Sequence, residues 1–322
     1  MGALTEVALK PLSHRDQNML DRIEQLYGRE VLENPRIGFN HYISTSCFLP
    51  YRDPGEIPMW VREEGQLTMI VTRGAAMNPF TKKPVLQGYP YGLRPRQLQS
   101  IINSEILRSG SREIYCGRSF CEFFKKRMKV EMRGGVGGNI GPLKEQFMRM
   151  YASRYQFFMQ SDRRALMVNP APMIEACGVW FSDDGEEWPP MLLISEPYAE
   201  SLLDGNAVPV NLDALALITG PLEHDFYTWV TRRVYSLRPG GKPVKISWDS
   251  MRWQFGKSFA DERSFRQVIR RTVSHLTKVV YRDLNISEVT GGWELRHSKL
   301  AVPAKQLWNG FTEARQLNMF AK

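Results

Sequence analysis

Few residues in this sequence are of the kinds that bind metals or form disulfides. Its 322 residues include only four cysteines and five histidines. The cysteines form no CxxC pair; they are Cys47, Cys116, Cys121 and Cys177. The histidines form neither an HxH pair nor an HExxH motif. These absences argue against a zinc site and against nicking enzymes that use paired histidines. We expect four reduced thiols and no metal.

Long apolar runs are also missing. No stretch approaches the roughly 18 uncharged apolar residues of a membrane-spanning helix. Residues 1–16 lack the apolar core of a signal peptide, and Glu6 stands where a myristoylation motif has Ser or Thr. We therefore expect a cytoplasmic chain with no membrane contact.

Nucleotide-binding motifs are incomplete. Five glycines fall within residues 134–141, but no lysine follows them in the register of a P-loop, and Ile140 replaces the third glycine of a dinucleotide fingerprint. Residues 256–258 read Gly-Lys-Ser, but Met251 stands where the first P-loop glycine belongs. There is no GxSxG motif either. We expect a binding protein without a cofactor rather than an enzyme. A nucleotide-binding enzyme is the weaker alternative, and saturable ATP or NAD binding would support it.

Basic residues are absent from one long segment and concentrated in two others. Residues 165–231 contain no Lys or Arg, whereas residues 108–164 have thirteen against five Asp and Glu, and residues 262–282 have six against one. The whole chain carries a net charge of +9. Two basic blocks separated by an acidic one indicate an anionic partner more strongly than the total charge does.

Apolar spacing predicts the elements around the first basic block. After the apparent turns at 51–58 and 77–84, we expect a helix at 93–110, an extended piece at 112–117, helices at 120–129 and 143–155, and hairpins over 155–169 and 175–196. Ser119 and Glu122 fit a capping box, and Leu143, Phe147, Met150 and Tyr151 form the expected buried stripe of the third helix. Gly134–Gly138 supply the turn before that helix, with Asn139 or Gly141 as its cap and Pro142 at its first position.

The same order recurs around the second basic block. The expected elements are a helix at 222–237, a strand at 244–248, a short helix at 249–256, a long helix at 262–281 and a hairpin over 285–297. In the long helix Phe265, Val268, Ile269, Val273, Leu276 and Val280 form the apolar stripe. Helix, strand, helix, helix, hairpin is the order of a winged helix-turn-helix.

We therefore predict an α+β fold with two tandem winged-helix domains. The predicted divisions are an N-terminal helical leader at 1–35, a first winged-helix domain with an N-terminal β extension at 36–197, a second winged-helix domain at 198–300 and a C-terminal tail at 301–322. The apolar strands expected within 36–90 either complete the first domain or pair two chains, so a homodimer is possible. The tail has the composition of a docking helix.

The polar faces of the two third helices are the candidate DNA contacts. Arginine can bind guanine and glutamine can bind adenine through two hydrogen bonds in the major groove. The candidates in the second unit are Arg263, Arg266, Gln267, Arg270, Arg271, Ser274 and Lys278. Those in the first unit are Lys144, Gln146, Arg149, Ser153 and Arg154.

Several stretches resemble the plasmid-encoded RepA replication initiators. They include "LPYRDPGEIPMWVREEGQLTMIVTRG", "DALALITGPLEHDFYTWVTRRVYSL", "VKISWDSMRWQFG" and "FRQVIRRTVSHL", and the resemblance covers about residues 45–295. It implies a bacterial cytoplasmic protein that binds repeated double-stranded origin sequences and recruits host initiator and helicase proteins. It also adds Arg118 to the candidate DNA contacts.

Residue by residue, the resemblance rests on two short patterns. The residues that match the family pattern "S-x-x-I-x-L-G-R-S-L-x-E-F" are Arg112, Gly117, Arg118, Ser119, Glu122 and Phe123. Arg149 matches the family pattern "Q-x-x-R". Cys116 replaces a usual aliphatic residue, and the glycine turn is longer than in the family.

Other binding roles fit the same residues. A transcriptional repressor would share every feature named so far, and replication of a plasmid carrying only this gene and its flanking repeats would separate the two functions. Binding to RNA or to a protein through the basic faces is a further alternative, which competition between RNA and origin DNA would test.

Overall fold

The structure, a computed structural model, describes residues 20–21, 23–24, 35–78, 81–117, 119–161, 164–167, 171–177 and 191–303. Most of the predicted leader helix lies outside these residues, and so does most of the predicted tail.

The first winged-helix unit has the predicted order of elements. It consists of α3 (Leu93–Ser109), β6 (Glu113–Tyr115), α4 (Phe120–Met128), α5 (Ile140–Ala152), β10 (Ile174–Cys177) and β11 (Met191–Ile194). The three strands form one antiparallel sheet in the order β10-β11-β6. Gly110 ends α3 with a left-handed φ of 67°, and the Ser119 side chain caps α4 by accepting a hydrogen bond from the Glu122 N–H.

The second unit repeats this topology. It consists of α8 (Pro221–Tyr235), β13 (Val244–Ser247), α9 (Trp248–Phe255), α10 (Glu262–His275), the π-helical turn η2 (Leu276–Val280), β14 (Ile286–Val289) and β15 (Gly292–Leu295). Its sheet order, β13-β15-β14, places the last strand against the first, as in the other unit. The hairpin turns at Gly291, whose φ is 84°. The predicted α+β fold with two winged-helix units is confirmed.

A short sheet lies between the two units. Strand β1 (Ile37–His41) pairs antiparallel with β12 (Ala207–Asn211), and the 3-10 turn η1 (Ile43–Thr45) follows β1. Helices α6 (Glu196–Leu203) and α7 (Leu212–Leu217) flank β12 in the chain. The division at residue 197 therefore falls in the first turn of α6, and β1 pairs with a strand from beyond it. The domain boundaries stay a prediction.

A second sheet joins the N-terminal region to the chain that follows α5. Its strands are β2 (Trp60–Glu64), β3 (Leu67–Thr72), β7 (Arg154–Ser161), β8 (Arg164–Met167) and β9 (Ala171–Pro172). Strands β2 and β3 pair with each other, and β3 pairs with β7 of the same chain. A separate ribbon of β4 (Ala75–Asn78) and β5 (Lys83–Leu86) occupies the place where sequence patterns predict only turns.

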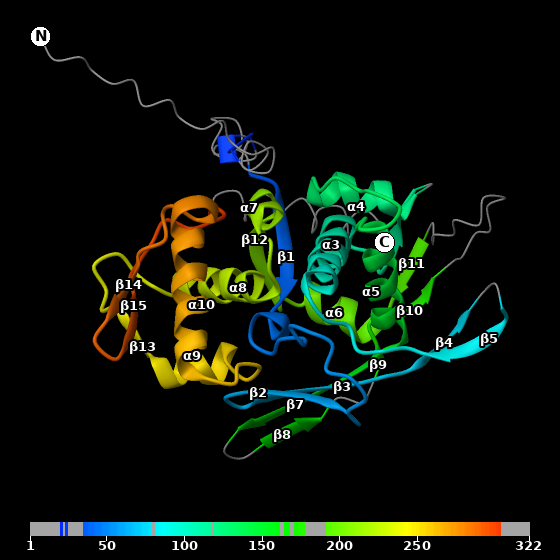
Figure 1. The fold of residues 1–322 in the computed structure, drawn as a ribbon, viewed down its shortest axis with the longest axis horizontal. Coiled ribbons are helices and arrows are strands. Elements are labelled where there is room, and N and C mark those ends of the chain that lie inside the picture. The colour runs from blue at the N-terminus through cyan, green and yellow to red at the C-terminus, as the bar shows by residue number, and fades with distance from the viewer. Residues whose placement is uncertain are drawn as a thin grey trace, which may run out of the picture.

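Figure 1 shows the two winged-helix units side by side, with β1 between them and the β2-β3-β7-β8 sheet across one end of the molecule. A continuous core connects these parts. Phe48, which precedes β2, stacks on Phe255 of α9 with ring centroids 5.5 Å apart, and Phe255 in turn contacts Phe226 and Trp229 of α8. Burying side chains of this size stabilises the fold by about 1.5–3 kcal/mol each.

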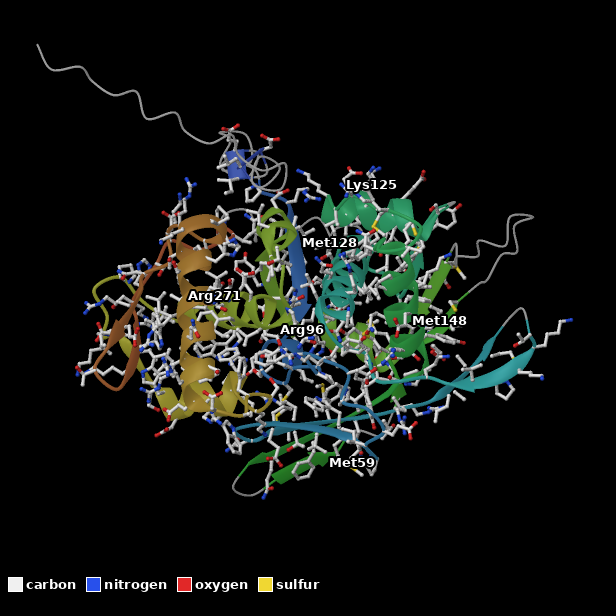
Figure 2. The ribbon with its side chains drawn as sticks, in the orientation of Figure 1. Met59, Arg96, Lys125, Met128, Met148 and Arg271 are labelled. Carbon is white, nitrogen blue, oxygen red and sulfur yellow. The ribbon has the colours of Figure 1, made fainter. Side chains whose placement is uncertain are left out.

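One buried ion pair joins the units directly. Arg96 of α3 and Asp225 of α8 are each 3% exposed and form two hydrogen bonds of 2.7 Å. The guanidinium also donates to the carbonyls of Leu49, Pro50 and Gly92, and Figure 2 shows it near the centre of the molecule. An arginine held by five acceptors restricts the packing of α8 on α3 to one geometry.

None of the described helices is both long and apolar enough to cross a membrane. None of the four cysteines forms a disulfide, and Cys47 and Cys116 are buried. Burial raises the pKa of both thiols to about 12, so each is protonated at neutral pH and is a poor nucleophile.

Candidate nucleic-acid interface

Helix α10 buries one face and exposes a basic one. Phe265, Ile269 and Val273 of its apolar stripe are buried. The helix begins at the predicted place because Asp261 caps it, accepting a hydrogen bond of 2.8 Å from the Ser264 N–H. The residues that the structure leaves exposed on the other face, continuing into η2, are Arg263, Gln267, Arg270, Arg271 and Lys278. Figure 2 labels Arg271 on this helix. The predicted division of α10 into an apolar and a cationic face is confirmed.

Two arginines of this face are already engaged. Arg270 holds Glu288 of β14 through a pair of hydrogen bonds, Nε to Oε2 at 2.9 Å and Nη2 to Oε1 at 2.7 Å. Arg266 bonds Glu262 one turn earlier. Both guanidinium groups also lie over the Trp248 ring, that of Arg266 at 5.0 Å and that of Arg270 at 5.5 Å from its centre. A DNA phosphate or base would compete with Glu262 or Glu288 for these two side chains.

The hydrogen bonds from Arg270 hold the pKa of Glu288 below its usual range. Glu288 is therefore an anion at neutral pH, and it positions the arginine over Trp248 as a fixed charge. By contrast, Arg263, Gln267 and Arg271 make no side-chain hydrogen bond or ion pair with any other residue that the structure describes. These three are the residues on α10 most available to a ligand.

Helix α5 is organised differently. Gln146 is 5% exposed, and its Oε1 accepts a hydrogen bond of 2.8 Å from the Tyr91 N–H. Ser153 is fully buried and donates to the Arg149 carbonyl at the end of the helix. The expectation that these two lie on an exposed face is wrong, because both satisfy backbone groups in the interior.

Arg149 is also held within the protein. It bonds Asp53 at 2.7 Å and Glu145 at 2.6 Å, donates to the Tyr89 carbonyl and lies 5.0 Å from the centre of the Tyr91 ring. Its side chain is only 14% exposed. Of the remaining candidates in this unit, Lys144 is half-buried on α5, and Arg154 is exposed at the start of β7. Arg118 lies outside the described residues.

The loop before α5 is tightly closed. Gly135 and Gly137 have left-handed φ angles of 76° and 78°, and a Cβ on Gly138 would lie 2.2 Å from the Arg133 carbonyl oxygen. Asn139 closes the loop: its side chain accepts from the Arg133 N–H and donates to the Glu131 carbonyl. It therefore makes no cap hydrogen bond to α5, contrary to one of the two predicted capping schemes.

The helix begins at Ile140, and this places Pro142 at its third position instead of its first. A proline is tolerated there because the first N–H groups of a helix have no internal partner.

Exposed cations of the first unit gather on α4 and just after it. Lys125, Lys126, Lys129 and Arg133 are exposed, and Figure 2 shows Lys125 at the end of the molecule where α4 lies. Lys125 pairs with Glu131 and Lys129 with Asp213, both at 3.0 Å. The sequence run Lys-Lys-Arg-Met-Lys at residues 125–129 is the signal that indicates this cluster.

A family model described as plasmid encoded RepA protein matches residues 90–250, half of the chain. The chain belongs to the family of plasmid-encoded RepA proteins. The resemblance inferred from the sequence is thereby confirmed. In this RepA-family chain the matched segment extends from just before α3 into the first turn of α9.

Among solved structures, the RepA-family chain is similar to a crystal structure of domains 2 and 3 of RctB, with a TM-score of 0.49 and 9% sequence identity. That likeness covers 81% of this chain and 98% of the other. No curated protein matches the chain.

Within the described part of the RepA-family chain, no group of three or more His, Cys, Asp or Glu side chains could hold a metal ion. Two of the described histidines make contacts within the protein. His41 stacks on Tyr198, and burial lowers its pKa to about 4. His275 of α10 bonds Glu223 of α8, and this hydrogen bond raises its pKa.

Proposed function

We propose that this chain is a plasmid replication initiator that binds repeated double-stranded DNA sequences at a plasmid origin in the bacterial cytoplasm. The observation that carries the proposal is the exposed cationic face of α10, set on a winged-helix unit. Membership of the plasmid-encoded RepA family supports the biological role. The protein acts by binding, without a catalytic residue or cofactor.

Base recognition is assigned to the unengaged side chains of α10. A helix of this kind fits the major groove, where Arg263 and Arg271 can each bind a guanine through two hydrogen bonds and Gln267 can bind an adenine. Lys278, beyond the end of the helix, is placed to meet a phosphate. Arg266 and Arg270 form a second set of DNA contacts. They bind DNA when it replaces the carboxylates of Glu262 and Glu288 as their hydrogen-bond acceptors.

The first unit contributes mainly phosphate contacts. The exposed cations on α4, just after it and at the start of β7 are Lys125, Lys126, Lys129, Arg133 and Arg154, and cations of this kind raise affinity without reading sequence. Because the Arg96–Asp225 pair fixes α8 against α3, both units approach the duplex with a set spacing. Repeated sites of one length would suit such a protein, and a bound array of copies would then recruit the host initiator and helicase proteins.

Two experiments test this function. In gel shifts on the plasmid origin, Arg263→Ala combined with Arg271→Ala should weaken binding by about 1–3 kcal/mol for each arginine, whereas Arg108→Ala, on α3, should not. With about 6 to 10 phosphate contacts, wild-type affinity should fall roughly a thousandfold or more between about 50 and 200 mM salt. Equal binding by all these proteins would refute the assignment of α10.

The second experiment separates initiation from repression. A plasmid carrying only this gene and its flanking repeats should replicate with the wild-type gene and fail with the α10 double variant. Binding to the origin without replication of such a plasmid would instead identify a repressor.

A further inference from the structure

Most of the β4–β5 ribbon is exposed: of the described side chains in residues 75–86, all but that of Ala76 are exposed. Its two strands pair with each other, and within the described residues no other strand joins them. Figure 1 shows the ribbon projecting away from the body of the molecule. Every residue of β5 is exposed. An isolated two-stranded hairpin has little stability in water, so a ribbon of this kind is suited to a surface that it meets on binding.

The base of the ribbon is fixed against α5. A Cβ on Gly74, which precedes β4, would lie 2.0 Å from the Ala152 carbonyl oxygen, and a Cβ on Gly88 would lie 2.4 Å from the Arg149 guanidinium. Both glycines therefore allow the chain to pack directly on the C-terminal end of α5. The Gln87 N–H closes the base by donating to the Gly74 carbonyl at 2.9 Å. The direction of the ribbon is thus tied to the first winged-helix unit.

The chemistry of the ribbon is cationic and apolar. Residues 75–86 contain two lysines, Lys82 and Lys83, and no Asp or Glu. Both lysines are exposed near the tip, as are the large apolar side chains Met77, Val85 and Leu86 at 59%, 41% and 61%. Proteins that grip DNA with ribbons combine cations for the phosphates with apolar side chains that contact the sugars and bases.

Two features favour DNA over a second copy of this chain. Pro84 in β5 has no N–H to donate, which weakens that edge for strand addition, and pairing two ribbons would bring four lysines together. The exposed Arg154 begins β7 and pairs in register with Thr72, two residues before Gly74, so a cation also lies near the base. The acidic side chains nearby, Asp53 and Glu56, are paired with Arg149 and Arg73.

We propose that the β4–β5 ribbon is a DNA-binding arm that contacts the duplex beside the site bound by the winged-helix units, with Lys82 and Lys83 on phosphates. This inference rests on the proposed function. A two-stranded ribbon fits a major groove in width, and contact with the backbone needs no particular base sequence. The arm extends the bound length of DNA and adds affinity without adding sequence preference.

The test compares the full chain with two double variants on one origin repeat with long flanks. Lys82→Asn with Lys83→Gln removes both charges, and asparagine suits position 82 because its φ is 52°. Lys82→Arg with Lys83→Arg keeps both charges and is the matched control. The neutral variant should reduce the slope of log K against log salt by about 1.8, since each lost phosphate contact contributes roughly 0.9. Hydroxyl-radical footprints should lose protection in the flank only.

The outcomes separate this proposal from the function on which it rests. If the wild type binds and the neutral variant keeps its salt slope and footprint, the arm does not contact DNA. If that variant instead changes the sedimentation of the free protein while its salt slope stays constant, the ribbon joins two copies of the chain, and the proposal is again overturned. If the wild type binds no origin DNA at all, the proposed function itself fails.

Discussion

Helices α5 and α10 occupy the same position in two units of the same topology, yet they use their polar residues in opposite ways. Helix α10 places its apolar residues on one face and leaves Arg263, Gln267 and Arg271 exposed and unengaged. Helix α5 buries Gln146 and holds Arg149 against acidic neighbours. The difference arises from what covers the polar face of each helix. Segments carrying Asp53 and Tyr91 pack on that of α5, whereas the arginines of α10 contact Glu288 of the wing and the Trp248 ring of α9. Two units of the same topology therefore expose different polar side chains on the corresponding helix.

The largest expected effect concerns the ion pair that holds the two units together. Asp225→Ala leaves the buried Arg96 charge without its carboxylate, and this should lower the free energy of unfolding by about 3–5 kcal/mol in a urea titration. Arg96→Met with Asp225→Leu should recover part of the loss, since no unpaired charge remains. A loss below about 1 kcal/mol for Asp225→Ala would show that the pair does not fix the packing of α8 on α3.

A second prediction separates structure from recognition within α5. Gln146→Ala leaves the Tyr91 N–H without its acceptor, and an unsatisfied buried donor costs about 1–3 kcal/mol. We expect a lower melting temperature and, below the transition, unchanged affinity for origin DNA. If Gln146→Ala keeps full stability but weakens DNA binding, Gln146 contacts DNA as the sequence suggested, and the contrast between the two helices is lost.

A third prediction sharpens the role of α10. Gln267→Ala should relax selection at a single base pair, reducing discrimination there by about 1–3 kcal/mol, or roughly 5- to 150-fold. Lys278→Ala is the matched comparison: it should weaken binding to all sequences alike and reduce the salt slope by about one. Selection of binding sites from a randomised pool distinguishes them. Uniform weakening by Gln267→Ala would remove it from base recognition.

The smallest expected effect is a pH dependence of folding stability that arises from His275, at the end of α10. The bond to Glu223 raises the folded-state pKa of His275 above its unfolded value of about 6.5. Its contribution to stability is therefore complete below about pH 6.5 and is lost as pH rises through the folded pKa. His41 and His224 have lowered pKa values, which act in the opposite sense.

The measurement is accordingly a difference in unfolding free energy between wild type and His275→Gln, taken from pH 5.5 to about pH 9. The difference should shrink as pH increases. A difference that stays constant over this range would mean that the charge on His275 does not contribute.

Much of the fold follows from local sequence patterns. The 3.6-residue spacing of Phe265, Ile269 and Val273 predicts α10, and Ser119 and Gly110 mark helix ends that the structure confirms. Pairings between distant segments could not be predicted in this way: β3 joins β7, and β1 joins β12, through backbone groups that carry no sequence signature. The ribbon of β4 and β5 lies where the sequence predicts a turn over residues 77–84, because its strands are short and poor in β-branched residues.

The candidate site, too, could be predicted from local patterns in one helix but not in the other. On α10 the stripe left by the apolar residues identifies an exposed face, since only one side of the helix is covered. On α5 the same reasoning fails because Gln146 satisfies the N–H of Tyr91, 55 residues earlier in the chain. Periodicity describes which residues share a face, but it cannot show that a distant segment will cover it.

The central claim is that α10, and not α5, makes the principal contacts with DNA. It is tested most directly by measuring affinity for one origin repeat, at fixed salt, for two variants that each remove two cations: Arg263→Ala with Arg271→Ala on α10, and Lys144→Ala with Arg149→Ala on α5. The α10 variant should lose at least tenfold more affinity than the α5 variant, with both proteins folded as judged by circular dichroism. An equal loss, or a greater loss from the α5 variant, would contradict the account.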